Sequence, residues 1–184
     1  MTGQDVAWLV LAAVLIVVAA LFAAADTALA RVSRTSVEQL ARQGRRGSAR
    51  LGRMVADPAR YLTVALFGRV ACEVLATVLV ARVTFEHVST PWVGVLVAAG
   101  VMVVVSYVLV GVAPRTLALQ HPARVAVTLA GPVSLLATVL GPLTQLLILL
   151  GNALTPGRGF RHGPFTSEAE LRELVDLAEQ DRLI

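Results

Sequence analysis

Long stretches of this 184-residue chain contain no charged side chain. Two of them cover residues 6–25 and 91–113, and a helix of about 20 apolar residues is long enough to span a bilayer. A third apolar stretch, residues 61–81, contains only Arg69 and Glu73 as charged residues. Because hydrocarbon offers no hydrogen-bond partner to the backbone, such stretches must be helical. The sequence therefore predicts an all-α polytopic membrane protein with three transmembrane helices, at about residues 6–30, 61–81 and 91–113.

The composition supports a membrane protein and argues against nucleic-acid binding. Hydrophobic residues make up 57% of the chain and charged residues 15%, whereas a soluble domain averages about 45–50% and about 25%. The 16 basic residues are all arginines, and eight of them fall between Arg31 and Arg60. Such clustering between two apolar stretches is typical of a loop that sets membrane topology. We therefore expect the lipid bilayer, and no nucleic acid, as a partner.

The arginine-rich loop, residues 31–60, also predicts the orientation, because such loops stay in the cytoplasm. The N-terminus and the turn at residues 82–90 would then lie outside. Trp8 and Trp92 fall at that outer interface, where amphipathic aromatic rings are enriched. No positive charge precedes the first apolar stretch, so we interpret it as a retained span rather than a signal peptide. We expect a multi-pass protein of the cell inner membrane with a cytoplasmic C-terminus.

The apolar segment at residues 125–154 permits two interpretations. Hydropathy alone favours a fourth span. Arginines on both sides indicate instead that its two ends share the cytoplasmic face; they are Arg115, Arg124, Arg158 and Arg161. Gly-Pro pairs at residues 131–132 and 141–142 divide the segment into pieces of about ten residues, which are too short to cross. We favour juxtamembrane helices over about residues 115–154.

The composition changes after Pro164. Ser167 and Glu170 form a capping-box pattern at the start of an acidic helix. We expect this segment to be cytoplasmic and to lead towards a further domain. The chain is thus divided into a membrane domain, residues 1–163, and an acidic linker helix, residues 164–184.

Three ionisable residues fall at membrane depth, namely Asp26, Arg69 and Glu73. Asp26 and Arg69 lie roughly 8 and 12 Å from the cytoplasmic ends of their helices, at the level where Gly111 and Pro114 are expected to end the third span. Ionisable residues inside a membrane are costly and indicate function. One interpretation is an ion pair, either Asp26 with Arg69 or Arg69 with Glu73. The other is an ion pathway, in which Pro114 frees carbonyl oxygens near Gly111 for a hard cation such as Mg²⁺.

The sequence contains no pattern of catalytic residues. Its three histidines are isolated from one another, and no Ser/His/Asp set falls at a common depth. We therefore expect no enzymatic activity.

Four segments carry short motifs in a fixed order. They are AAADTALARVSR (23–34), DPARYLTVALFGRVACEV (57–74), GVAPRTLALQHP (111–122) and FTSEAELRELVDLAEQ (165–180). Together they resemble the transmembrane domain of the CorC/CNNM family of magnesium transport and homeostasis proteins, often labelled haemolysin-like. The resemblance implies three spans, a juxtamembrane helical belt, paired CBS domains beyond the linker, and a dimer with a second copy or a paralogue.

Gly94 and Ala98 are small residues at helical spacing in the third span. Small residues let helices approach closely. These two either form the implied dimer interface or let the spans of one chain pack together.

The residues that the resemblance assigns to Mg²⁺ are largely replaced. The family uses a Ser hydroxyl on the first helix, Asn side chains on the second and a Glu in the third motif. The corresponding positions here are Ala23, Ala25, Arg69, Glu73 and Gly111. This leaves Asp26, Glu73 and Gly111 as a degenerate metal site, with Arg69 as a substitute for the cation and Asp26 as its expected partner.

The resemblance implies magnesium transport or homeostasis, and no cofactor other than Mg²⁺ itself. The loss of ligands supports an alternative, in which the chain is a transport-silent paralogue. Such a paralogue would act as a structural or regulatory partner in the membrane.

Overall fold

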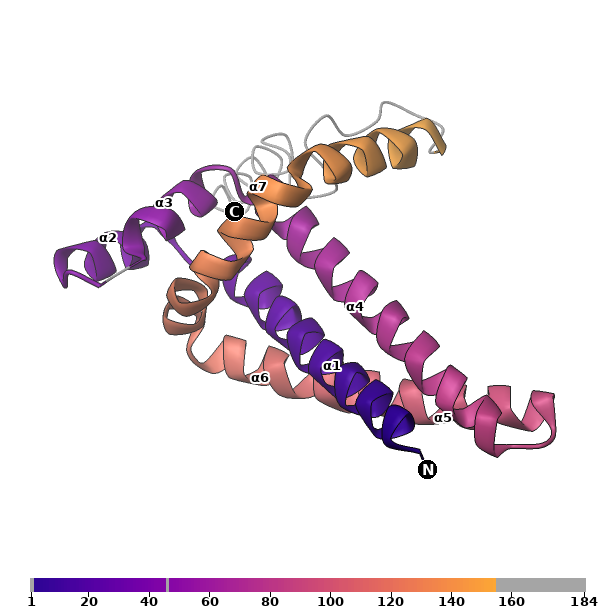
Figure 1. Ribbon diagram of the computed structural model, residues 1–184. Coiled ribbons are helices and arrows are strands. Elements are labelled where there is room, and N and C mark those ends of the chain that lie inside the picture. The colour runs from indigo at the N-terminus through magenta and orange to yellow at the C-terminus, as the bar shows by residue number, and fades with distance from the viewer. Residues whose placement is uncertain (1, 46, 155–184) are drawn as a thin grey trace, which may run out of the picture.

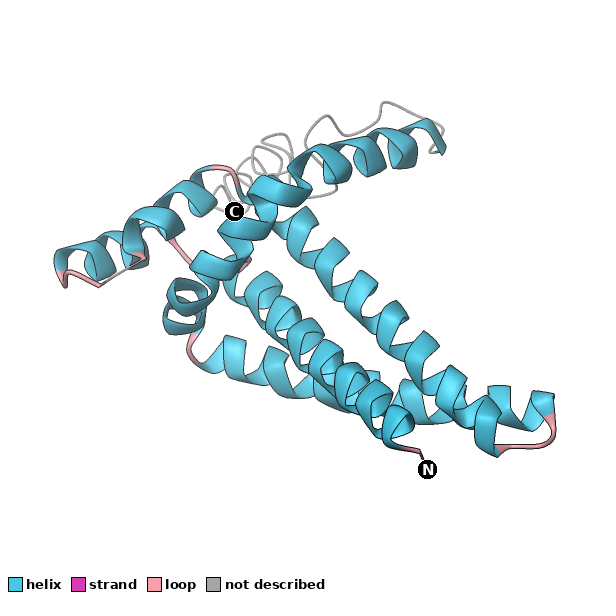
Figure 2. Cartoon of the chain, in the orientation of Figure 1, coloured by secondary structure: helices cyan, strands magenta, loops and turns pink. Residues whose placement is uncertain are grey.

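The computed structural model describes residues 2–45 and 47–154, which are almost entirely helical (Figure 1 and Figure 2). In chain order the elements are α1 (Gly3–Leu29), α2 (Arg34–Arg42), α3 (Ser48–Ala56), α4 (Pro58–His87), α5 (Pro91–Val105), the π-helix η1 (Ser106–Val112), α6 (Ala113–Gln120) and α7 (Pro122–Leu154). No strand occurs within these ranges, which confirms the prediction of an all-α protein. The acidic segment at residues 164–184 lies outside the described residues.

Four helical stretches are long and apolar enough to cross a membrane. Three of them agree with the predicted spans, at Gly3–Leu29, Arg60–His87 and Pro91–Gln120, although the first ends one residue early and the other two extend further along the chain. The fourth is Pro122–Pro142 within α7. Their outer surfaces are aliphatic, with side chains such as Val17, Val78 and Val103 about 60% exposed or more. A surface of this kind suits hydrocarbon and not water. The chain is a polytopic membrane protein.

Small residues hold α1 close to α4. The two helices run antiparallel side by side (Figure 1), and Ala19 on α1 and Ala76 on α4 are completely buried. Nearer the arginine-rich loop, the ring of Phe22 lies against Gly68, where an added Cβ would be 2.9 Å from the ring atoms. Because small side chains let helix backbones approach, this contact fixes the spacing of the two helices.

The core is densest at the end of the molecule that carries the arginine-rich loop. There α1 and α4 pack against α3 and α7 through buried side chains that include Phe22, Leu29, Leu51, Met54, Leu62, Ala65, Ala126, Ala130 and Val133. Figure 1 shows that α7 runs across the ends of α1 and α4 rather than alongside them. This arrangement supports the juxtamembrane interpretation of α7, whose position relative to the bilayer stays a prediction.

The helix does not end at Gly111 and Pro114, and the point at which the third span leaves the bilayer stays a prediction. The chain remains helical over Pro91–Gln120 and widens into a π-helix over Ser106–Val112. Pro114 has no amide hydrogen, and its ring crowds the preceding turn. The wider turn accommodates this, and the amide of Ala113 donates to a carbonyl five residues back. The proline therefore changes the register of the helix without ending it.

The prediction that two Gly-Pro pairs divide residues 125–154 into short pieces is wrong. α7 is one helix of 33 residues, with Pro132 and Pro142 inside it. It bends along its length (Figure 1), as helices with internal prolines do. A proline bends a helix without ending it when neighbouring elements form hydrogen bonds with the backbone groups that it leaves unpaired.

Arg60 packs against the second pair. Its guanidinium donates a hydrogen bond of 3.3 Å to the carbonyl of Ala137, one residue before the carbonyl that Pro142 leaves without a helical donor. The same group packs on Gly141, where an added Cβ would lie 3.3 Å from Nη2. The glycine thus leaves room for the arginine beside the bend.

Gly94 and Ala98 do not form a surface for a second copy. Both are buried within the single chain, and an added Cβ at Gly94 would lie 2.8 Å from the ring of Phe85 on α4. The prediction of a dimer interface at these residues is therefore wrong. They serve the alternative role, which is to let α5 pack against α4 inside one chain.

Candidate functional site

Asp26 lies at the level of the membrane domain where α1, α4 and α6 meet, and we call this level the layer of Asp26. Its side chain is half-buried, and the neighbouring Ala25 and Ala28 are at most 1% exposed. The carboxylate interacts electrostatically with the guanidinium groups of Arg69 on α4 and Arg115 on α6. Helices from three parts of the chain thus bring one acid and two bases together.

Arg69 makes its direct ion pair with Glu73, one turn further along α4. The Nε group donates to Oε1 of Glu73 at 2.8 Å, and the two side chains are 33% and 23% exposed. Within the described part of the chain, no pair within 4.0 Å joins Arg69 to Asp26, so Asp26 is not the direct partner that we expected. Residues four apart on a helix already face each other, whereas the pair with Asp26 would have to cross between helices.

Arg115 is a member of this layer that sequence reasoning missed. It was considered only as one of the charges that set topology. The signal that locates it is its place directly after Pro114, one turn from Gly111. Because the helix continues through the proline, Arg115 stays within electrostatic range of Asp26 on α1.

The π-helix brings an irregular backbone to the same layer. Single π-helical turns inside α-helices are frequent at functional sites. An added Cβ at Gly111 would lie 3.6 Å from the carbonyl oxygen of Ser106, which is an ordinary contact. Nothing in the backbone therefore requires a glycine at this position, and a Cβ fits there without strain.

The metal site predicted at Asp26, Glu73 and Gly111 stays a prediction. Gly111 has no side chain, Glu73 is bound to Arg69, and Asp26 faces two guanidinium groups. In the described ranges, no group of three or more His, Cys, Asp or Glu side chains is placed to hold a metal ion. The layer thus contains two carboxylates, Asp26 and Glu73, that interact with the guanidinium groups of Arg69 and Arg115.

Glu73 also lines a groove on the outer side of the helices. This groove has a volume of about 400 Å³ and lies between α4 and the α5–η1 segment. Thr77 and Ser106 are the other polar side chains that line it. The side chain of Glu73 thus pairs with Arg69 and also lines a mostly aliphatic groove.

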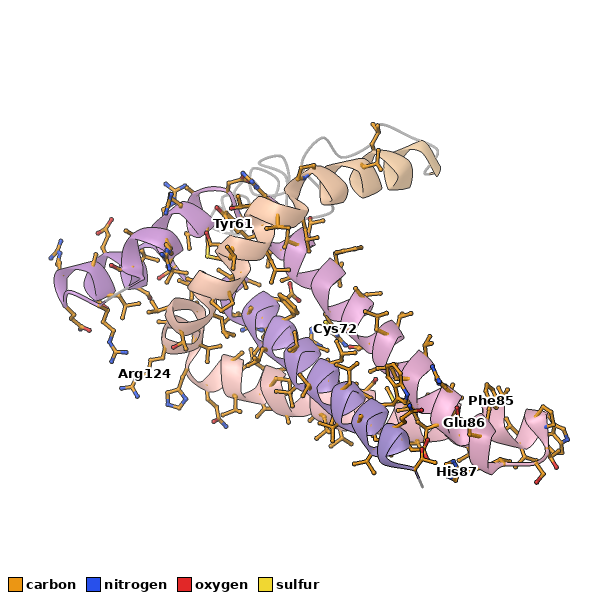
Figure 3. The ribbon with its side chains drawn as sticks, in the orientation of Figure 1. Tyr61, Cys72, Phe85, Glu86, His87 and Arg124 are labelled. Carbon is orange, nitrogen blue, oxygen red and sulfur yellow. The ribbon has the colours of Figure 1, made fainter. Side chains whose placement is uncertain are left out.

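A second polar cluster joins α1 to α4 at the opposite end. Asp5 is 2% exposed and lies 3.6 Å from Nε2 of His87. Arg82 is 3.6 Å from Glu86 and stacks on the ring of Trp8 at 4.9 Å. Figure 3 shows Glu86 and His87 at that end of α4. This cluster fastens the start of α1 to α4 and lies far from the layer of Asp26.

Known proteins resemble this chain over most of its length. The UPF0053 protein Rv2366c of Mycobacterium tuberculosis is 47% identical over 167 residues, which is 91% of this chain and 38% of the relative. The UPF0053 inner membrane protein YfjD of Escherichia coli is 29% identical over 75% of this chain and 31% of the relative. The chain thus spans about a third of the length of these relatives.

A profile of the cyclin M transmembrane N-terminal domain matches residues 10–184. The match includes all four of the segments that carry the resemblance, which lie between residues 23 and 180. With the helical architecture and the related proteins, it is decisive: the chain belongs to the cyclin M transmembrane N-terminal domain family.

Proposed function

We propose that this protein acts in divalent-cation homeostasis, with Mg²⁺ as the ion, as a member whose membrane site does not bind the ion itself. It would serve as a structural or regulatory partner in the inner membrane, with no enzymatic step. The observation that supports this most strongly is that Asp26, at the layer where the family resemblance places the ion, interacts electrostatically with Arg69 and Arg115.

Electrostatic repulsion is the physical reason. At an effective dielectric of about 20, a dication about 8 Å from one guanidinium is disfavoured by roughly 4 kcal/mol. Asp26 and Glu73 contribute two negative charges to the layer, and Arg69 and Arg115 contribute two positive ones. The layer is therefore close to neutral without an ion, and a bound Mg²⁺ would leave it with an excess of positive charge.

A second copy or a paralogue would supply what this chain lacks. We propose a dimer, and we place its interface on exposed helix surface rather than at Gly94 and Ala98, which are internal. The groove that contains Glu73 supports this choice, since it leaves a carboxylate facing out from the helices.

Direct transport is the second candidate function. It is favoured by the π-helical turn beside Pro114, because a proline inside a helix leaves a carbonyl oxygen without its helical donor. Carbonyl and carboxylate oxygens are the ligands that Mg²⁺ prefers. In this case Arg69 would have to leave the layer when the ion enters.

A flux measurement separates the two candidates. The purified protein is placed in liposomes that contain a fluorescent Mg²⁺ indicator. Because the layer already contains its cations, we expect no flux above that of protein-free liposomes. A flux that Asp26→Asn abolishes and that Arg82→Gln, at the opposite end, leaves intact would establish direct transport.

A further inference from the structure

A groove of about 490 Å³ lies between α1, α6 and α7. Ten of the twelve residues that line it are aliphatic, and the two others are Arg124 and Thr128. The carboxylates of the layer described above do not line it. Its chemistry is that of a site for a hydrocarbon chain with one polar end.

Small residues on α1 give the groove its depth. Ala20 and Ala24 are one turn apart and leave room that a larger side chain would fill. Leu21, Leu109 and Leu117 stand around them and are 49%, 50% and 60% exposed. In a membrane these leucines contact lipid, so the groove opens to the hydrocarbon. The lining residues of α1 run from Ile16 to Ala24, and the eight helical steps between them cover about 12 Å.

Arg124 provides the polar end. It lies in the first turn of α7 and is exposed, and Figure 3 places it at the edge of the molecule where α6 meets α7. None of the carboxylates in the described ranges forms an ion pair with it. A guanidinium matches the geometry of a phosphate group and can donate two parallel hydrogen bonds to it.

We propose that this groove binds an anionic phospholipid, with an acyl chain along Ala20 and Ala24 and the phosphate on Arg124. Basic pockets between membrane helices on the cytoplasmic side are suited to anionic headgroups. Charge complementarity favours this occupant over a second copy of the chain. An aliphatic helix in the groove would cover Arg124 without providing a counter-ion.

Native mass spectrometry of the full chain tests the proposal. The protein is mixed with equal amounts of phosphatidylglycerol and phosphatidylcholine that have identical acyl chains. The parent should retain phosphatidylglycerol preferentially. Arg124→Gln should reduce that retention about fivefold, since one arginine contributes about 1 kcal/mol to anionic-lipid binding. Arg42→Gln removes an exposed arginine that does not line the groove and should leave retention unchanged.

A second variant tests the position of the acyl chain. Ala20→Phe fills the groove and should reduce the retention of both lipids. Equal retention of the two lipids by the parent, or equal effects of Arg124→Gln and Arg42→Gln, would overturn the proposal. So would an Ala20→Phe variant that separates a dimer while its lipid retention is unchanged, because the groove would then belong to a second copy.

Discussion

Gly68→Leu should lower the free energy of unfolding by about 2 kcal/mol. Overfilling a packed contact costs about 1–3 kcal/mol or somewhat more, and the better helix propensity of leucine offsets about 1 kcal/mol of this. The side chain has no room, because even a Cβ at Gly68 would lie 2.9 Å from the ring of Phe22. Phe22 is 6% exposed inside the core, so its ring cannot move away freely. The measurement is a denaturation curve of the purified protein in detergent.

A matched variant and a rescue make this result specific. Gly100→Leu places the same side chain on α5, where nothing lies within 4 Å of an added Cβ, and should not destabilise the protein. Phe22→Ala in the Gly68→Leu background should recover part of the loss, because the leucine then fills the vacated space. If the two glycine variants unfold alike, the contact between α1 and α4 is not as close as described.

Arg69→Ala should lower the free energy of unfolding by about 3 kcal/mol. Removal of one partner of a buried ion pair costs about 3–5 kcal/mol, because it leaves the other charge without compensation. The lower value is appropriate here, since the two side chains are 33% and 23% exposed. Glu73 loses its hydrogen-bonded partner, and Asp26 loses one of its two guanidinium groups. Thermal and chemical denaturation in detergent provide the measurement.

The chain contains a close control for this variant. Arg82 and Glu86 form a pair at the same helical spacing on the same helix, with side chains 53% and 49% exposed. Exposed pairs contribute about 1 kcal/mol or less, and the exposed contact of Arg82 with the ring of Trp8 contributes about 0.5–1 kcal/mol, so Arg82→Ala should have a smaller effect than Arg69→Ala. Glu73→Ala in the Arg69→Ala background should restore part of the lost stability. Equal losses of the free energy of unfolding for Arg69→Ala and Arg82→Ala would contradict this prediction. The pair of Arg69 would then stabilise the protein no more than an exposed pair does.

The spans could be predicted from the sequence because their signal is local. An uncharged run of 23 residues such as 91–113 has few alternatives to a membrane helix. The ends of the helices were harder to predict, because the residues packed around a proline determine whether it ends a helix or only bends it. Pro114, Pro132 and Pro142 all lie inside helices, and the residues that pack around them, such as Arg60, come from distant parts of the chain.

The sequence predicted most of the charged residues of the candidate site, but it did not predict which of them pair with one another. Asp26, Arg69 and Glu73 could be found because charges are rare in apolar stretches. Their partners depend on how the helices are rotated about their axes, which hydropathy does not determine. Arg115 was missed for the same reason, because its electrostatic interaction with Asp26 requires the helix to continue past Pro114. The role of Gly94 depended on Phe85, a residue on another helix.

We propose that the side chains of Arg69 and Arg115 replace the ion at the layer of Asp26. The most direct test of this proposal is the Mg²⁺ dependence of thermal unfolding, measured in detergent for the parent and for Arg69→Asn/Gly111→Glu. The double variant removes one cation and adds an acid where an added Cβ meets only ordinary contacts. A ligand at about 100 times its Kd stabilises a protein by about 2.7 kcal/mol. NaCl at equal ionic strength controls for screening.

We expect no Mg²⁺-dependent stabilisation of the parent and a clear one of the double variant. The parent already contains the charges that balance Asp26 and Glu73, whereas the variant has acidic and amide oxygens without a cation. If Mg²⁺ stabilises the parent at least as strongly as the double variant, the arginines do not replace the ion, and direct transport is the better account of this protein.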